Sequence, residues 1–348
     1  MGSYLNPGNK GFQESLNSKI YVDKTGLIEK TNAALNTRQK FVCVSRPRRF
    51  GKSMAADMLA AYYARGEDSA ELFKSLKIRK AESYEKHRNQ YDVIKVNMQE
   101  FLSMTHSMDE MLSMLQKYLI FDLMDHFETV RFRDEHNLIQ VMKDIYSKTN
   151  HSFIILIDEW DCLFREYKQD KEAQKEYLDF LRAWLKDKDY VALAYMTGIL
   201  PIKKYGSHSA LNMFTEYSMT DPGDLAEYFG FTEKEVFALC EKYDMSFEEA
   251  KMWYDGYQLI AHRQTGNEIY SMYSPKSVVD AMLRHKFGTY WNQTETYEAL
   301  KIYIQMDMDG LKDSVVRMLA GDAVSIHIGT FSNDMITFAT NEIGRAHV

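Results

Sequence analysis

The segment Ser45-Arg46-Pro47-Arg48-Arg49-Phe50-Gly51-Lys52-Ser53 ends in a glycine, a lysine and a serine at consecutive positions. It lies between a short β-prone apolar run at 41–44 and a helical pattern, so backbone N–H groups and the positive end of the helix dipole converge there. Gly51 allows close approach of the backbone, Lys52 would bind the β- and γ-phosphates, and Ser53 would bind Mg²⁺ through its hydroxyl. The segment therefore has the arrangement of a P-loop, or Walker A motif, and predicts a nucleoside triphosphate site.

The first glycine of the G-x-x-x-x-G-K-[ST] pattern is replaced by Arg46. Pro47 also removes one N–H group from the loop. Arg46, Arg48 and Arg49 either hold phosphates through their guanidinium groups, or are solvated charges of a surface turn or a subunit contact. We favour a phosphate or partner contact, because three arginines beside Lys52 would repel one another without an anion. The residues predicted to bind the nucleotide are Arg48, Arg49, Phe50, Gly51, Lys52, Ser53 and Met54.

Two acids, Asp158 and Glu159, directly follow the apolar run at 153–157. A buried strand that delivers two acids at its carboxyl end is typical of a Walker B segment. Asp158 would hold Mg²⁺ directly or through water, and Glu159 would polarise the attacking water as general base. The alternative is an ordinary acidic helix cap. Ligands of open α/β sheets bind at the carboxyl ends of strands, so the pairing with a P-loop favours the catalytic interpretation.

Thr197 directly follows the apolar run at 191–196 and adds a third polar group to the same edge of the predicted sheet. Its hydroxyl either senses the γ-phosphate or the attacking water, or is satisfied locally where the strand turns. The predicted catalytic residues are thus Glu159, Lys52 and Thr197, and the predicted metal ligands are Ser53 and Asp158.

Strand and helix patterns alternate over residues 41–219, which is typical of βαβ units and a mostly parallel sheet. Apolar β-prone runs lie at 41–44, 93–96, 153–157 and 191–196, and helical spacing covers 26–36, 52–65, 104–127 and 177–186. Beyond Asp221 the patterns are helical, at 225–228, 233–243 and 247–254. We expect an α/β fold, a P-loop NTPase sheet flanked by helices, with a mainly helical lid behind it. The expected division is a P-loop core at 1–220, a lid and C-terminal region at 221–341, and a non-native tail at 342–348, which reads like a translated sequencing adapter.

The composition limits the class of protein. With 45% hydrophobic and 27% charged residues, the 348-residue chain has enough apolar side chains to build a core, which excludes a disordered chain. Its 3 cysteines are too few for a disulfide framework, and its longest apolar run is too short to span a bilayer. A net charge of -7 argues against nonspecific binding of polyanions. We expect a cytoplasmic protein.

These motifs resemble those of the predicted AAA-ATPase-like proteins of bacteria. The resemblance rests on Tyr21-Val22-Asp23-Lys24-Thr25, on the loop at 46–53, on Ile157-Asp158-Glu159, on Thr197-Gly198-Ile199, on Ser209-Ala210-Leu211-Asn212 and on Trp253-Tyr254-Asp255-Gly256-Tyr257. In this family an arginine at position 46 is the normal choice. The resemblance implies ATP as ligand, an ASCE-type, AAA-like parallel sheet with the sensor strand between the P-loop and Walker B strands, and a helical lid.

The resemblance also implies a partner. Members of the family often carry a PD-(D/E)xK nuclease-like domain after the ATPase region, which here would begin beyond Asn341. A contact with nucleic acid or with another protein would be made through that domain, and oligomerisation is left open. The chain itself has no evident Asp…(Asp/Glu)-x-Lys arrangement on paired strands.

Together, the motifs favour an ATP-binding, Mg²⁺-dependent ATPase module that works as a nucleotide-driven conformational switch. One alternative is a nucleotide-gated interaction protein that hardly hydrolyses ATP, motivated by the unusual Arg46-Pro47 loop. Another is the regulatory half of a nuclease whose catalytic domain lies outside this chain.

Overall fold

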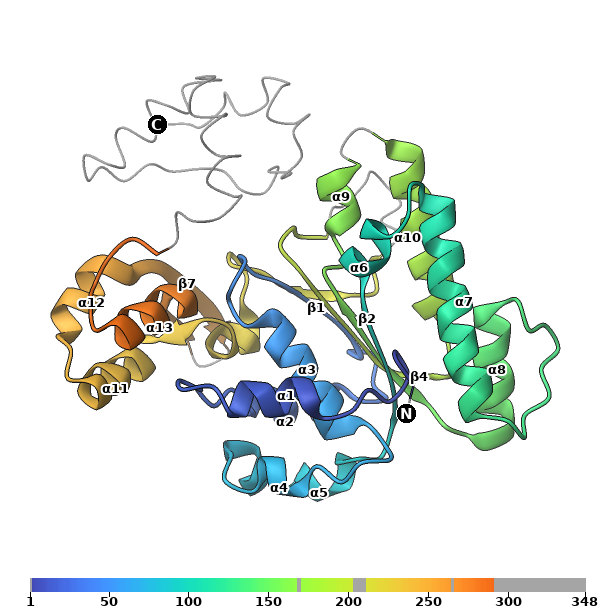
Figure 1. Ribbon diagram of the computed structural model, residues 1–348, viewed down its shortest axis with the longest axis horizontal. Coiled ribbons are helices and arrows are strands. Elements are labelled where there is room, and N and C mark those ends of the chain that lie inside the picture. Colours follow the sequence, from blue (N-terminus) through green and yellow to red (C-terminus); the bar gives the residue numbers. More distant parts are fainter. Residues whose placement is uncertain (1, 168–169, 203–210, 264–265, 291–348) are drawn as a thin grey trace.

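A five-stranded parallel sheet with helices on both faces forms the centre of the computed structural model, which describes residues 2–167, 170–202, 211–263 and 266–290 (Figure 1). The strands lie in the order β2-β3-β4-β1-β5, and every pair of neighbours is parallel. β4 therefore separates β1 from β3, as expected for the sensor strand, and the predicted α/β class is confirmed. The strand bounds are β1 Phe41–Ser45, β2 Asp92–Asn97, β3 Phe153–Asp158, β4 Val191–Gly198 and β5 Thr215–Tyr217.

The strands are apolar because helices cover both faces of the sheet. Successive side chains of a strand point to opposite faces. Phe153, Ile155 and Ile157 of β3 pack into one hydrophobic cluster, and Ile154 and Leu156 pack into the other. All positions of β3 are buried, which explains why this strand reads as a continuous apolar run in the sequence.

Each hydrophobic cluster is closed by its own layer of helices. One layer consists of α1 Lys10–Leu16, α2 Gly26–Ala34, α3 Lys52–Tyr63, α4 Ala70–Phe73, the 3₁₀ helix η1 Lys77–Lys80 and α5 Tyr84–His87. The other consists of α6 Met98–Ser103, α7 Met108–His126, α8 Leu138–Thr149, α9 Cys162–Glu166 and α10 Lys171–Leu185. Among the described residues, no helix has both the length and the apolar character that a membrane span requires.

A smaller unit, here called the lid, follows the central sheet. Its helical segments that begin at Gly223, Glu233 and Phe247 agree with the prediction. The helix that begins at Pro275 and the antiparallel sheet, with strand order β6-β8-β7, were not predicted. Most side chains of β7 are exposed, and only Leu259 and Ala261 are buried, so no apolar run marks this strand. The elements are η2 Gly223–Tyr228, β6 Phe231–Thr232, α11 Glu233–Tyr243, α12 Phe247–Tyr254, β7 Asp255–Arg263, β8 Gly266–Tyr273 and α13 Pro275–Arg284. The predicted tail at 342–348, together with all of 291–348, lies outside the described residues.

An N-terminal segment joins the lid to the core. Lys24 donates one hydrogen bond of 2.6 Å to a carboxylate oxygen of Glu235 and another of 2.6 Å to the carbonyl oxygen of Glu227. Burial lowers the pKa of the Lys24 ammonium, and the charge of Glu235 opposes that shift. Ile20 packs beside Val236 in the core of the lid. The family motif around Lys24 therefore serves as an anchor for the lid.

Candidate functional site

The loop between β1 and α3 leaves the start of α3 open to an anion. Gly51 precedes the helix with φ +88°, and no heavy atom would lie within 4 Å of a Cβ at that position. α3 begins without a side-chain cap, so its first-turn N–H groups are available to a phosphate. Arg49 also has a positive φ of 67°, which is uncommon for a residue other than Gly, Asn or Asp. The loop thus has the form of a phosphate cradle.

Lys52 is the first residue of α3, and its side chain contacts the loop that precedes it. Its side chain is only 5% exposed, and Nζ donates to the carbonyl oxygens of Arg46 at 3.0 Å and Pro47 at 2.9 Å. Burial lowers the pKa of the Lys52 ammonium, and the nearby charges of Glu159 and Asp158 oppose that shift. An ammonium group has three N–H donors, so the two bonds to the loop leave capacity for a phosphate oxygen.

Asp158 and Thr197 meet at the carboxyl ends of neighbouring strands. The Thr197 hydroxyl donates to Oδ1 of Asp158, which also accepts the Glu159 N–H at 3.0 Å. Both side chains are buried. Thr197 also lies level with Val44 of β1, so the structure brings its hydroxyl to the edge at which the P-loop starts. The hydroxyl therefore positions the Asp158 carboxylate, and a direct role towards phosphate stays a prediction.

Ser53 and Asp158 are a suitable protein contribution to a Mg²⁺ site. Mg²⁺ prefers oxygen ligands and usually keeps several waters, so one or two protein ligands plus phosphate oxygens are the expected set. Ser53 is exposed at the start of α3, and Asp158 ends β3 close enough to Lys52 to affect its pKa. The described residues contain no group of three or more His, Cys, Asp or Glu side chains that could hold a metal without such outside ligands.

Glu159 has an unusual backbone conformation and a cationic partner. Its φ is +53°, a conformation that costs a glutamate about 1–3 kcal/mol. The Arg165 guanidinium forms an ion pair with its carboxylate. The same guanidinium lies 3.6 Å from Asp161 and 3.5 Å from the side-chain oxygen of Gln99. Sequence analysis missed Arg165, although its i, i+4 spacing from Asp161 on a helical pattern is a usable signal.

Asp161 joins the ends of β3 and β4. Its fully buried carboxylate accepts the N–H of Ile199 at 3.1 Å and that of Leu200 at 2.8 Å. A Cβ at Gly198 would come within 2.6 Å of Trp160 Nε1 and 2.7 Å of Asp161 Oδ1, so only glycine fits there. Asp161 therefore fixes the loop that follows Thr197 and is a second site residue that sequence analysis did not identify.

Arg46 has a different surrounding from the other loop arginines. It is 0% exposed, and Nη1 donates to the carbonyl oxygens of Ser45 at 3.1 Å and Tyr217 at 2.6 Å. The guanidinium carbon lies 5.7 Å from the centre of the Phe229 ring, and burial lowers the pKa of Arg46 to about 10. Arg46 thus attaches the loop to β5 and to the end of η2, a role that neither proposed interpretation of this residue included.

This placement predicts that Arg46→Gly, which restores the usual glycine pattern, destabilises the protein. We expect the free energy of unfolding to fall by roughly 2–4 kcal/mol, because a buried side chain and its hydrogen bonds are lost. Urea denaturation of the nucleotide-free protein measures the effect. Arg49→Gly is the matched control, since its exposed side chain and positive φ predict unchanged or slightly higher stability. Equal midpoints for Arg46→Gly and the native chain would contradict the anchoring role.

The remaining predicted nucleotide-binding residues divide into exposed and buried ones. Arg48, Arg49 and Met54 are exposed beside the loop. Phe50 is buried, its ring packs edge-on against Tyr257 of β7 at 5.5 Å, and its carbonyl oxygen accepts the Gly230 N–H at 3.1 Å. Both the side chain and the carbonyl group of Phe50 therefore belong to the contact between the loop and the lid.

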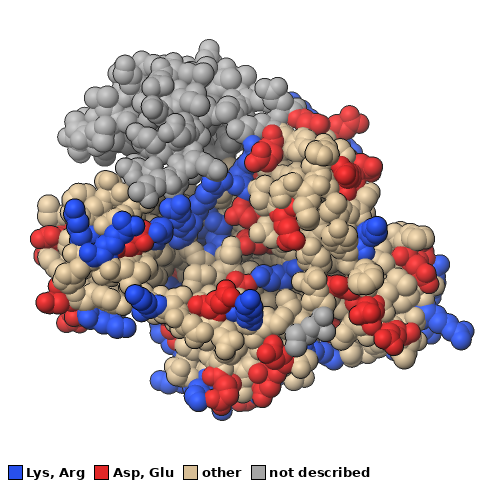
Figure 2. Space-filling view, viewed as in Figure 1, with Lys and Arg blue, Asp and Glu red and all other residues tan. Residues whose placement is uncertain are grey.

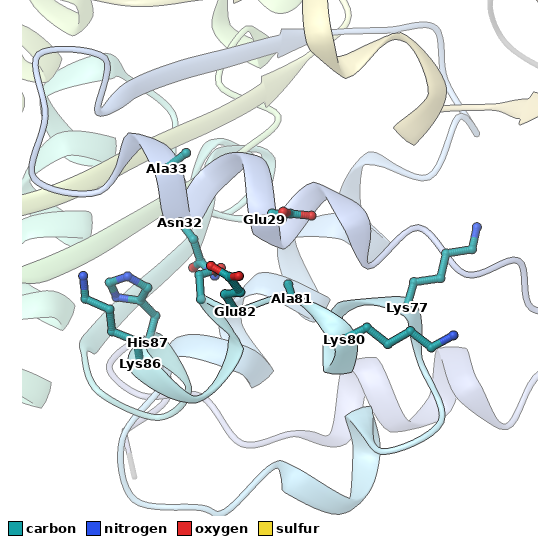
Figure 3. A pocket seen from close by; sticks show the side chains of 10 residues that line it. Glu29, Asn32, Ala33, Lys77, Lys80, Ala81, Glu82, Lys86 and His87 are labelled. Carbon is teal, nitrogen blue, oxygen red and sulfur yellow. The ribbon is translucent and has the colours of Figure 1, made fainter.

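Basic side chains gather along the hollow between the lid and the helices that cover the sheet (Figure 2). Such a gathering attracts anions. A separate pocket of about 650 Å³ lies between α2, η1 and α5, and Lys77, Lys80 and His87 are among the residues that line it (Figure 3). None of the predicted nucleotide-binding residues lines that pocket, so it is not part of the candidate site.

Comparison with known proteins agrees with these features. A family described as "Predicted AAA-ATPase" matches residues 9–207, which is more than half of the chain and includes the loop at 46–53 and the acids Asp158 and Glu159. The chain belongs to this family. Membership of the predicted AAA-ATPases implies a nucleotide-binding ATPase built on a P-loop.

Individual relatives are distant. An uncharacterized protein encoded in the vnfD 5′ region of Azotobacter chroococcum mcd 1 is 23% identical over 331 residues, which cover 91% of this chain and 59% of that protein. The chain thus spans about three fifths of the length of this relative. The replication initiator DnaA bound to AMPPCP and single-stranded DNA is 11% identical with a TM-score of 0.36, covering 91% of this chain and 76% of DnaA. PCH-2 from C. elegans is 10% identical with a TM-score of 0.29, and the match covers 70% of this chain and 52% of the PCH-2 chain.

Proposed function

We propose that this predicted AAA-ATPase binds ATP with Mg²⁺, hydrolyses it, and uses the nucleotide state to move its lid. The observation that carries the proposal is the meeting of three strand ends. Lys52 begins α3 directly after the loop that follows β1, β3 ends in Asp158 with Glu159 next to it, and β4 lies between β1 and β3 and brings Thr197 to the Asp158 carboxylate. A phosphate cradle, a metal-binding acid and a general base are the parts that phosphoryl transfer to water requires.

Each residue would contribute one part of the chemistry. The first-turn N–H groups of α3 and the Lys52 ammonium would hold the β- and γ-phosphates. Ser53 and Asp158 would hold Mg²⁺, which supplies charge neutralisation on the phosphate oxygens when bound. Glu159 would accept a proton from the attacking water. Thr197 would keep Asp158 in position through its hydrogen bond.

The proposed switch relies on direct contact between loop and lid. Phe50, next to Gly51, packs against Tyr257 and accepts a hydrogen bond from Gly230. Gly230 has φ +88°, and a Cβ there would lie 3.1 Å from the Phe50 ring, so the lid lies directly on the loop. A loop that tightens around a phosphate would therefore shift the lid through this contact.

Hydrogen exchange with and without nucleotide tests this proposal. We expect ATP with Mg²⁺ to slow amide exchange in β7 and β8 at least several-fold, because a closed lid opens less often, and we expect EDTA to cancel the effect. Tyr257→Ala is expected to keep ATP binding but to lose most of the protection of the lid. Ile269→Ala, on an exposed position of the adjacent strand, is the matched control and should respond as the native chain does. If the amide exchange rates of β7 and β8 in the native chain are the same with and without ATP, the proposed switch is contradicted.

A second candidate function is a nucleotide-gated interaction protein with slow hydrolysis. The ion pair between Glu159 and Arg165 favours it, because the guanidinium occupies the carboxylate that an attacking water would have to reach. Turnover of the native chain that is lost in a Glu159 variant would decide for the hydrolase. A nuclease-like partner domain, contact with nucleic acid and a cytoplasmic location stay predictions based on sequence and resemblance.

A further inference from the structure

Arg165 is a cation that the nucleotide site does not yet account for. It belongs to α9, the helix that follows Asp158 and Glu159 in the chain, and only 17% of its side chain is exposed. Its three side-chain partners all lie around the site: the Glu159 carboxylate, Asp161 at 3.6 Å and the Gln99 oxygen at 3.5 Å. A mostly buried arginine at a phosphate site has the planar fork of donors that matches phosphate oxygens.

The charge of Arg165 reaches the phosphate cradle. The pKa of Lys52 is lowered first by burial and, to a smaller extent, by the positive charge of Arg165, whereas Glu159 and Asp158 raise it. Geometry also connects Arg165 to the start of the phosphate loop: Asp161, 3.6 Å from its guanidinium, accepts the Leu200 N–H at 2.8 Å, and the Leu200 carbonyl oxygen accepts the Ser45 hydroxyl at 3.2 Å. In the nucleotide-free chain the guanidinium is paired with the carboxylates of Glu159 and Asp161. An anion at the cradle would compete with those carboxylates for the guanidinium.

The present partner of Arg165 is the predicted general base. A carboxylate oxygen that is occupied by a guanidinium is not available to an attacking water until the ion pair opens. Glu159 has a positive φ at the end of β3, and its carboxylate forms the ion pair with Arg165 of α9. The nucleotide-free chain thus holds its general base in an ion pair.

We propose that Arg165 is a catalytic arginine supplied by the same chain. When ATP binds, the Arg165 guanidinium moves from the Glu159 carboxylate to the terminal phosphate. This inference rests on the proposed function and assigns one further residue to it. The guanidinium forms hydrogen bonds with the terminal phosphate oxygens, and its departure frees the Glu159 carboxylate. In the reaction the water oxygen bonds to the terminal phosphorus while the bond from phosphorus to the bridging oxygen breaks. The water proton passes to Glu159, and the electron pair of the broken bond leaves with ADP.

Separate affinities for ATP and ADP test this assignment. Arg165 touches only the terminal phosphate, so Arg165→Ala is expected to weaken ATP binding about 10-fold and to leave ADP binding unchanged, as measured by isothermal titration calorimetry. The kcat is expected to fall at least 100-fold, since arginines at phosphoryl-transfer sites contribute about 10³–10⁵ in kcat. Arg165→Lys should recover part of the ATP preference but little of the kcat, because an ammonium lacks the fork geometry.

The outcomes separate this inference from the proposed function. Arg182→Ala, an exposed arginine of α10, is the matched control and should keep both affinities. If the native chain binds ATP but Arg165→Ala keeps both its ATP-to-ADP preference and its kcat, the assignment is overturned and the proposed function stands. A higher kcat in Arg165→Ala would also overturn it, because Arg165 would then only restrain Glu159. If Arg165→Ala does not fold, Arg165→Lys carries the test through its kcat and affinity ratio.

Discussion

Replacement of Lys52 by alanine is expected to lower the affinity for ATP by about 100-fold, close to loss of binding at ordinary nucleotide concentrations. Lys52 is the buried cation at the cradle, and hydrogen bonds to charged groups contribute about 1.5–3 kcal/mol each. Isothermal titration with ATP and Mg²⁺ measures this change. The native chain should show saturable binding of ATP. EDTA should weaken this binding, because Mg²⁺ would be held by Ser53, Asp158 and the phosphate oxygens together.

Controls distinguish lost binding from lost folding. Lys52 also donates to the Arg46 and Pro47 carbonyl oxygens, so its removal costs some stability of the loop. Lys52→Met keeps the apolar stem of the side chain and removes only the charge. Lys10→Ala, at a fully solvated position of α1, is the neutral comparison. Unchanged ATP affinity in both Lys52 variants, with folding intact, would contradict a phosphate-binding role for this residue.

Replacement of Glu159 by glutamine is expected to lower kcat by about 10²–10⁴-fold while ATP binding is retained. A glutamine cannot accept the water proton, and general base catalysis contributes about that factor. We expect ATP affinity to stay equal or to increase, because Arg165 no longer forms an ion pair with a carboxylate at position 159. Single-turnover measurement of phosphate release separates the chemical step from binding.

The control for this variant is Glu166→Gln, an exposed acid on α9 that should leave turnover unchanged. Phosphate release that survives in Glu159→Gln at the native rate would assign the general base elsewhere. No measurable release in the native chain, with ATP binding intact, would instead favour the nucleotide-gated interaction protein.

The central sheet could be predicted because the burial of each strand is visible in the strand's own residues. Strands covered on both faces must be apolar at nearly every position, so β1, β3 and β4 are visible as runs in the sequence. The polar residues that follow such runs must lie at one edge of a parallel sheet. This reasoning placed Lys52, Asp158 and Thr197 near one another, and the hydrogen bond between Thr197 and Asp158 agrees with it.

The antiparallel sheet of the lid was not predictable in the same way. β7 and β8 bury few side chains, and outward positions such as Ile260 and Ile269 are apolar although exposed, so hydrophobic alternation fails. The pairing of these strands depends on contacts with η2 and Phe50 that come from distant parts of the chain.

The amino-acid order alone was enough to indicate which chemistry the chain carries. A glycine, a lysine and a serine at a helix start, and two acids at the end of an apolar strand, predict a phosphate site because each motif depends only on its immediate backbone. Tertiary structure decided which partners those groups have. Arg46 donates a hydrogen bond to the carbonyl oxygen of Tyr217, 171 residues away. Phe50 packs edge-on against Tyr257, and Arg165 forms an ion pair with Glu159. The direction of a long charged side chain is set by competition among all carbonyls, carboxylates and rings within its reach, and only the folded chain brings those groups together.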